Sequence, residues 1–118
     1  MEHVLLLHAN VEGYSTLSPE EVDKLYAEHQ AFQTALTEAG VARPYSAELH
    51  PSPTAKIVRS AGDDWLLTDG PFTETKEQLG GLYVIDVPDM DAAVYWARRI
   101  PVIAGDAVEV RATKATGE

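Results

Sequence analysis

Histidine is the side chain in this sequence that is best suited to acid–base chemistry, because its ordinary pKa lies closest to neutral pH. One histidine, His29, falls within a stripe of apolar residues spaced three and four apart, which puts them on one helical face. The stripe consists of Val22, Leu25, His29, Phe32, Leu36 and Ala39. Loss of hydration on this face favours the neutral imidazole, which can accept a proton. We therefore predict that His29 is a general base; the alternative is a half-buried histidine with a structural role.

A general base needs a group that orients it and a second group that returns the proton. Asp69, or after it Glu74, is expected to orient His29, although the Asp-Gly pair is also typical of an ordinary turn. His8 or His50, at or near the ends of expected strands, is expected to be the second acid. Contacts to the substrate are expected from His50, Phe72, Glu74 and Tyr83. Phe72 is alternatively a core residue.

No metal or cofactor is expected. Cysteine is absent, which excludes disulfide scaffolds, thiolate metal sites, iron–sulfur clusters and thiol catalysis. His8, His29 and His50 with a carboxylate would suit zinc or iron, but no two histidines show a local ligand spacing. The sequence also lacks a phosphate-binding glycine loop after a strand, a GxSxG motif and a dinucleotide-binding fingerprint. These features favour chemistry that needs no cofactor.

The composition is that of one acidic globular domain. The chain has 118 residues, of which we assign residues 1–112 to the domain and residues 113–118 to a frayed tail. Nine basic and 19 acidic residues give a formal charge of −10, which repels phosphate, so nucleic acid and anionic membranes are not expected as partners. The first residues, MEHVLLL, contain neither a basic leader nor an apolar run of membrane-spanning length. We therefore expect a cytoplasmic location.

Two helices and six strands are expected to position these side chains. The first helix starts at Ser18-Pro19, where serine can cap and proline suits the first turn, and it stops at Gly40. The second helix runs from residue 88 to residue 99 and ends before Pro101. Its predicted inner face consists of Met90, Ala93, Val94, Ala97 and Ile100. Strands are expected at residues 3–8, 45–49, 55–60, 65–68, 80–87 and 107–112, with a charged loop at residues 73–77.

This order predicts an α+β fold: a ferredoxin-like split βαβ unit with an expanded central hairpin, an antiparallel sheet and two helices on one face. Residues 3–8 and 80–87 are the central strands of this topology, and both are apolar on both faces. The helices cover only one face, and a second copy of the sheet is the simplest cover for the other. We therefore expect a homodimer through the sheet faces. Trp65 and Trp96 are expected to pack in the core or in the dimer.

The run LTDGPFTETKEQLGG at residues 67–81 closely resembles the signature of the DGPF-containing branch of the YCII-related proteins. Further matching segments are LSPEE at 17–21, EAG at 38–40, VIDV at 84–87, ARRIP at 97–101 and VEVR at 108–111. The resemblance implies a dimeric α/β-barrel fold and a His–Asp pair as the proposed active centre. His29 stands at the family's histidine position, eleven residues before Gly40, whereas Ile100 replaces the aspartate.

We predict a small-molecule enzyme of lyase or isomerase type that uses histidine-based acid–base chemistry without a cofactor. Its small apolar or aromatic substrate would bind between the helices and the sheet, and elimination, isomerisation or cyclisation would start from a proton next to a carbonyl or on a phenol. The resemblance adds that one wider relative is a dehydrochlorinase of a chlorinated aromatic diol. The first alternative is a non-catalytic ligand-binding or regulatory accessory protein, because some members accompany extracytoplasmic-function sigma factors. The second is a dimer whose histidines are structural.

Overall fold

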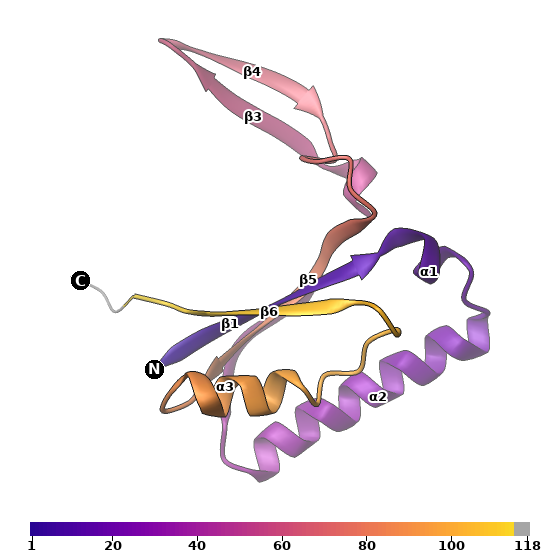
Figure 1. Ribbon diagram of the computed structural model, residues 1–118, viewed down its shortest axis with the longest axis vertical. Helices are drawn as coiled ribbons and strands as arrows, with labels where there is room; N and C mark the ends of the chain where they lie inside the picture. The colour runs from indigo at the N-terminus through magenta and orange to yellow at the C-terminus, as the bar shows by residue number, and fades with distance from the viewer. Residues whose placement is uncertain (115–118) are drawn as a thin grey trace.

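The computed structural model describes residues 1–114, which form an α+β fold built on a four-stranded antiparallel sheet (Figure 1). The strands of this sheet are β1 (Glu2–Asn10), β2 (Ala42–Glu48), β5 (Glu77–Asp86) and β6 (Ala107–Ala112). Helices α2 (Pro19–Glu38) and α3 (Met90–Ala97) cover one of its faces. The strand order is β2-β5-β1-β6, with β1 and β5 in the centre, which confirms the predicted ferredoxin-like arrangement.

Helix α2 begins and ends where its sequence predicts. The Ser18 hydroxyl accepts a hydrogen bond from the Glu21 N–H, and the Glu21 carboxylate accepts one from the Ser18 N–H, which completes a capping box. Gly40 follows the helix with a φ of 73°, a left-handed conformation that glycine adopts without strain. Helix α3 is capped by Asp89 and is shorter than predicted, because it ends at Ala97. Within residues 1–114, no helix combines the length and apolarity needed to cross a membrane.

The core lies between the sheet and the C-terminal half of α2, where Phe32 and Leu36 are buried. The buried residues of the core are Leu5, Phe32, Leu36, Tyr83, Ile85, Val87, Ala93, Trp96, Ala97 and Ile100. Two predicted core positions are wrong, since Ala39 and Met90 are exposed. Ala39 lies at the C-cap of α2 and Met90 opens α3, so both stand at helix ends beyond the packed surface.

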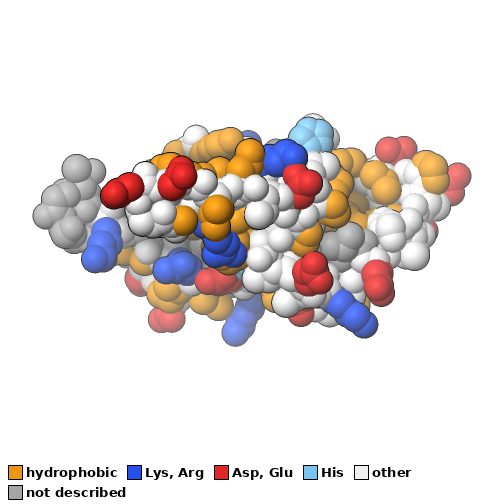
Figure 2. Space-filling model, turned by 90° about the horizontal axis from the view of Figure 1, so that it is seen from above, with side chains coloured by type: hydrophobic (Ala, Val, Ile, Leu, Met, Phe, Trp, Pro, Cys, Tyr) orange, Lys and Arg blue, Asp and Glu red, His pale blue; other side chains and the backbone are white. Residues whose placement is uncertain are grey.

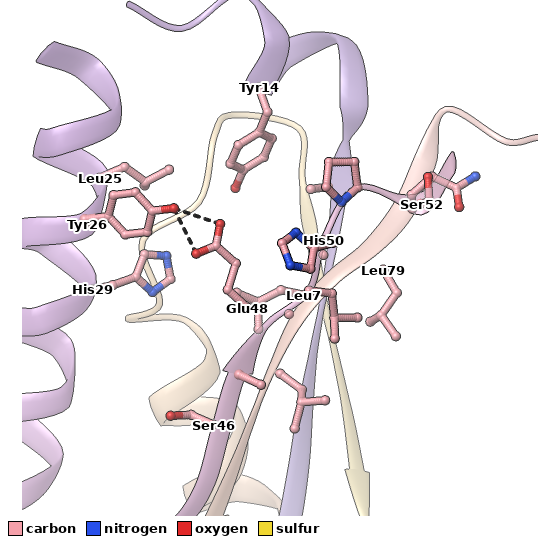
Figure 3. A pocket seen from close by; sticks show the side chains of 18 of the residues that line it. Leu7, Tyr14, Leu25, Tyr26, His29, Ser46, Glu48, His50, Ser52 and Leu79 are labelled. Atoms are coloured by element: carbon pink, nitrogen blue, oxygen red, sulfur yellow. Dashed lines mark hydrogen bonds between the residues drawn. The ribbon is translucent and has the colours of Figure 1, made fainter. Parts of the chain in front are cut away.

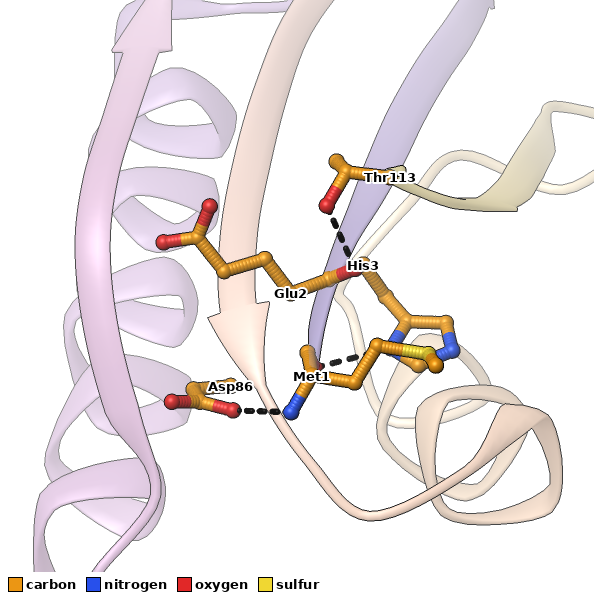
Figure 4. A network of polar contacts seen from close by, with 5 residues as sticks. All are labelled: Met1, Glu2, His3, Asp86 and Thr113. Atoms are coloured by element: carbon orange, nitrogen blue, oxygen red, sulfur yellow. Dashed lines mark hydrogen bonds and ion pairs between the residues drawn. The ribbon is translucent and has the colours of Figure 1, made fainter. Parts of the chain in front are cut away.

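The start of β1 is held from both sides (Figure 4). The N-terminal amino group of Met1 pairs with Asp86 at 2.6 Å, and the Thr113 N–H donates to the carbonyl of Glu2 at 3.0 Å. The buried His3 has its Nδ1 3.1 Å from the carbonyl of Met1, which gives this histidine a structural contact. Thr113, from the predicted tail, thus continues the pairing beside β1, and the last four residues lie outside the described part of the chain.

The predicted central hairpin forms from β3 (Lys56–Ala61) and β4 (Asp64–Asp69), but it is a two-stranded sheet separate from the main one. We call residues 56–69 the arm. Figure 1 shows the arm projecting away from the body. Gly62 has a φ of 65° in its turn. The short helix α1 (Val11–Ser15) and the 3₁₀ turn η1 (Ser52–Thr54) are not predicted, because neither is long enough to show a periodic apolar stripe.

The face of the sheet opposite the helices, which we call the outer face, is apolar at its centre. In the register of β1 and β5, Val4 lies opposite Val84 and Leu6 lies opposite Leu82. These four side chains alternate along their strands with core residues, so they point away from the helices. All four are partly accessible in the single chain. The sheet therefore has an apolar surface on each side, of which its own helices cover one.

Candidate functional site

A cavity of about 680 Å³ lies between the N-terminal part of α2 and the sheet, where the sequence predicts a cleft (Figure 3). The apolar side chains of its wall include Leu7, Val22, Leu25 and Leu79. On the sheet side Ala9, Gly80 and Gly81 also line it, and these small residues leave the space unfilled. A Cβ at Gly81 would lie 3.0 Å from the carbonyl oxygen of Ala47, so the backbones of β5 and β2 approach each other closely at this glycine.

His29 takes part in a chain of hydrogen bonds along the cavity wall. Its Nδ1 lies 2.8 Å from the hydroxyl oxygen of Tyr83, and the two rings are stacked with their centroids 6.0 Å apart. The Gln33 amide donates to the same hydroxyl oxygen at 3.2 Å. His29 and Gln33 are four residues apart on α2, so they lie on one helical face, and Tyr83 meets both from β5. We call these three residues the relay.

The surroundings of the relay keep His29 neutral. Burial lowers its pKa below the ordinary value of 6.5, and a hydrogen bond to the backbone carbonyl of Pro101 acts in the opposite direction. Burial raises the pKa of Tyr83, so this hydroxyl stays protonated. In the tautomer whose Nδ1 carries no hydrogen, the Tyr83 hydroxyl donates to His29, and the donors run from Gln33 through Tyr83 to His29.

Two carboxylates act on the charge of His29, and the larger effect comes from Glu48, at the end of β2, followed by Glu28 on α2. Both carboxylate oxygens lie 2.8 Å from the hydroxyl of Tyr26, which joins α2 to β2 beside His29 (Figure 3). The same hydrogen bond raises the pKa of Tyr26. The negative charge of Glu48 raises the pKa of His29, against the effect of burial. It would therefore stabilise an imidazolium once His29 has accepted a proton.

His50 and Tyr14 supply further polar groups from the other side of the cavity (Figure 3). His50 follows β2 and precedes η1, and its side chain is accessible. Burial, and after it the charge of Asp106, raises the pKa of Tyr14. A hydrogen bond to Asp106 raises this pKa further, so the Tyr14 hydroxyl stays protonated at neutral pH and its one hydrogen is directed to the Asp106 carboxylate.

The structure brings three of the predicted site residues to this cavity, namely His29, His50 and Tyr83. Four others lie outside it in a single chain. The Nε2 of His8 is 2.9 Å from a carboxylate oxygen of Glu109 on β6, and Asp69 pairs with Lys56 at the base of the arm. Phe72 and Glu74 are exposed in the segment after the arm. Asp69 is separated from His29 because β4 belongs to the projecting arm, and the histidines do not converge because His8 faces β6.

Four polar residues of the site, Tyr14, Tyr26, Gln33 and Glu48, are not among the predicted ones. Tyr26 and Gln33 stand three residues before and four residues after His29, so the helical period could have placed both on its face. Alternation along β2 could have placed Glu48 on the same side of the sheet as Ser46. No signal in the sequence shows that Tyr26 of α2 lies beside Glu48 of β2, because this contact depends only on how the helix packs on the sheet.

The DGPF run at residues 69–72 forms the root of the arm. Asp69 is ion-paired with Lys56, and the Gly70 N–H donates to the carbonyl of Ala55 at 2.7 Å. The guanidinium of Arg59 lies over the ring of Phe72, 5.0 Å from its centroid. Each of these contacts joins the end of β4 to β3 or to the residue before it, so the run has a structural role in the chain.

Replacing Gly70 with alanine is expected to destabilise the protein by about 1–3 kcal/mol. A Cβ at this position would stand 2.7 Å from the Cβ of Ala55 and 3.1 Å from two carbonyl oxygens, so the two strands of the root must separate. The free energy of unfolding in urea measures the change. Gly13→Ala is the matched control, because the nearest atom to its Cβ is an ordinary 3.9 Å away. An equal effect of both substitutions would contradict the close approach.

The lowered pKa of His29 predicts how stability depends on pH. The unfolded chain binds a proton at this ring near its ordinary pKa of 6.5, whereas the folded chain binds it only at lower pH. The stability that neutral His29 contributes is therefore complete above pH 6.5 and is lost as the pH falls towards the lowered pKa. Melting temperatures between pH 7.5 and about 5 should fall more steeply for the wild type than for His29→Gln. Parallel curves would show that the folded chain leaves this pKa unchanged.

Comparison with known proteins places this chain in a family. The family model of the YCII-related domain matches residues 1–115. A curated relative from Rhizobium meliloti (strain 1021), described as an uncharacterised protein, is 36% identical over 98 residues, which span 83% of this chain and 78% of the relative. The match extends over β1, α2, the arm, β5, α3 and β6, so it includes both the cavity and the DGPF run. The chain belongs to the family of YCII-related domain proteins.

Proposed function

We propose that the protein is a cofactor-independent acid–base enzyme that acts on a small, mostly apolar or aromatic molecule in the cavity between α2 and the sheet. The observation that carries this proposal is the neutral His29, joined through Tyr83 to Gln33 on the wall of an apolar cavity. A neutral imidazole is a suitable base near neutral pH. A cavity of about 680 Å³ is within the usual range for small-molecule sites.

The relay supplies a route for one proton. A proton leaves a substrate carbon next to a carbonyl, or a phenol oxygen, and binds the hydroxyl oxygen of Tyr83. The hydrogen that Tyr83 already carries moves to Nδ1 of His29 over the 2.8 Å hydrogen bond. His29 becomes an imidazolium beside the charge of Glu48, and the electron pair stays on the substrate as an enolate or phenolate. Return of the proton to another atom completes an isomerisation, and loss of a leaving group completes an elimination.

His50 is the residue we assign to the negative oxygen that this step creates. It lines the cavity from outside the relay, and its side chain is accessible. Donors fixed in an apolar site stabilise a developing oxyanion more than they would in water. The apolar wall would then hold the remainder of the substrate.

The functional unit is a homodimer in which two outer faces pack together. The apolar side chains of Val4, Leu6, Leu82 and Val84 are partly accessible in one chain and form the centre of that face. Burial of about 800 Å² per chain is the usual size of a stable interface. Sedimentation at micromolar concentration is expected to give a dimer, and a monomer at that concentration would contradict this assembly.

The competing function is a non-catalytic ligand-binding or regulatory accessory protein. The charge of −10 favours it, since an acidic surface can dock on a basic partner protein. Both functions predict that small molecules bind in the cavity, but only the enzyme moves a proton. The two are therefore separated by a measurement of chemistry on a molecule that is shown to bind.

The test screens small aromatic ketones, phenols and chlorinated aromatic diols for a rise in melting temperature, which marks binding to the folded state. Each compound that binds is then incubated with the protein in D₂O, and the loss of its C–H signals is followed by proton NMR. An acid–base enzyme that abstracts a carbon-bound proton should exchange that proton for deuterium. If compounds bind in the cavity and none exchanges or reacts, the accessory-protein function is favoured.

A further inference from the structure

The arm carries large apolar side chains that its own chain does not cover. In the register of β3 and β4, Val58 lies opposite Leu67 and Ser60 lies opposite Trp65. Val58, Trp65 and Leu67 therefore share one face of the ribbon, and they are 59%, 65% and 68% exposed. Every residue of the arm is exposed except Ile57, which is partly buried. We call the side chains of Val58, Trp65 and Leu67 the apolar face of the arm.

An isolated two-stranded hairpin is at best marginally stable in water. Its strands need a third strand or an apolar surface to pack against, and the exposure of the arm shows that the body supplies little of either. Figure 2 shows the molecule from above, and hydrophobic side chains reach the surface in several places on the face that it shows. A second apolar surface must therefore cover the arm if the arm is ordered in solution.

The size of the exposed surface supports the same conclusion. A compact protein of 12.9 kDa exposes about 6,300 Å², whereas this chain exposes 8252 Å². Its radius of gyration is 16.3 Å, compared with about 13.5 Å for a compact domain of this length. The excess surface is larger than the roughly 800 Å² that each partner buries in a standard interface. The chain thus has the surface of a subunit and not of a compact monomer.

The direction of the arm indicates which surface lies nearby. In Figure 1 the helices lie on one side of the sheet, and the arm leaves on the opposite side, which is the side of the outer face. Two packed sheets are about 10 Å apart, and strands of six residues reach about 20 Å. A sheet packed on the outer face would therefore lie beside the arm along much of its length.

We propose that the apolar face of the arm packs against a second copy of this chain, as a clamp that extends the contact between two outer faces. The inference rests on the outer-face dimer proposed above and names a further part of its interface. Charge favours this part, because the arm contains two basic and three acidic residues, whereas the rest of the chain carries a formal charge of −9. The arm therefore carries a net charge of only −1, which a second acidic copy repels weakly.

The clamp would also order one wall of the cavity. The segment that joins β2 to the arm contains His50 and Ser52, and both line the cavity. The DGPF run, which begins at the last residue of β4, is joined to the end of this segment by the hydrogen bond from the Gly70 N–H to the carbonyl of Ala55. A partner that holds the arm therefore holds this segment, so dimerisation positions His50.

Two neighbouring leucines provide a matched pair of variants. Leu67 is on the apolar face, and Leu66 is on the opposite face of the same strand; both are exposed in one chain, so serine at either position should leave the fold intact. Leu67→Ser is expected to raise the dissociation constant of the dimer by about 100-fold in sedimentation equilibrium. Leu66→Ser is expected to change it by less than about fivefold. Equal effects of the two variants, or no effect of Leu67→Ser, would overturn the clamp.

A third variant separates this inference from the outer-face dimer. Val84→Glu puts a charge in the centre of the outer face and should dissociate the dimer if the two sheets pack there. Dissociation by Val84→Glu but not by Leu67→Ser supports the outer-face dimer and overturns the clamp. Dissociation by Leu67→Ser but not by Val84→Glu supports a contact through the arm and overturns the outer-face dimer. A wild-type protein that remains monomeric at about 100 µM overturns both the clamp and the outer-face dimer.

Hydrogen exchange of the unaltered protein gives an independent result. Backbone amides of residues 57–68 are expected to exchange at least tenfold more slowly well above the dissociation constant of the dimer than well below it, because the partner covers the ribbon. Amides of Leu36 and its neighbours in α2 serve as the internal control, since the core of a single chain protects them. Arm amides that exchange at the same rate at both concentrations would contradict the clamp.

Discussion

Replacing His29 with glutamine is expected to slow deuterium exchange of a bound substrate by about 100-fold or more. Glutamine keeps a polar side chain on the cavity wall, but its amide cannot take the proton that Tyr83 releases. The rate is measured by proton NMR at saturating ligand, and a titration confirms that the ligand still binds. Gln30→Ala, at an exposed position next to His29 on α2, is the control and should stay within threefold of the wild type.

Tyr83→Phe should cause a similar loss, because the hydroxyl that joins the substrate to His29 is then missing. Since both residues act in the same relayed proton transfer, the double variant should be no slower than the slower single variant. Two losses that multiply would instead mean that His29 and Tyr83 act on separate steps. Exchange by His29→Gln within threefold of the wild type would contradict the proposed function itself.

The fold was predictable where local chemistry and apolar spacing agree. The capping box at Ser18 and the glycine stop at Gly40 define α2, and both follow from short-range hydrogen bonds that the residue types specify. Strand β5 shows where this agreement ends. It begins at Glu77, three residues before the predicted start, because Glu77 and Gln78 pair with Asn10 and Ala9 of β1. These two polar residues belong to the strand only because they pair with β1, and such long-range pairing leaves no pattern in the neighbouring sequence.

The candidate site was predictable to a smaller extent. The helical stripe directs His29 towards the sheet, and burial gives it the expected neutral form. Its partner was predicted as Asp69, but the residue beside it is Tyr83, 54 positions away along the chain. Alternation in β5 fixes which face Tyr83 occupies, whereas the height of α2 above that strand depends on the packing of the whole core. A hydrogen-bonded pair across two layers therefore could not be read from either segment alone.

The DGPF run illustrates how a distinctive motif can point to the wrong kind of role. Its aspartate and phenylalanine suggest a carboxylate and an aromatic wall, and the structure uses them with Lys56 and Arg59 to close the root of the arm. The sequence also allows an ordinary turn at Asp69, because Asp-Gly pairs are common where strands end. What the sequence did not indicate is that the hairpin would leave the body, since two short strands give no sign of which surface covers them.

Replacing Leu36 with alanine is expected to reduce the free energy of unfolding by about 2–5 kcal/mol. Leu36 is fully buried, and with Phe32 it anchors the C-terminal half of α2 on the sheet, while the N-terminal part of the same helix stands over the cavity. Such a loss is a large share of the roughly 5–15 kcal/mol that stabilises a domain.

Urea unfolding measures the cost, and Met90→Ala is the control, because Met90 is exposed and its truncation should stay within about 0.5 kcal/mol. Leu36 is more than one helical turn from His29, so the variant leaves every group of the relay in place. Weaker ligand binding by the folded variant would therefore show that the cavity is held open by the core beneath the other end of α2. A loss of stability below 1 kcal/mol would mean that Leu36 is not the anchor, and that residues around the cavity themselves hold the helix.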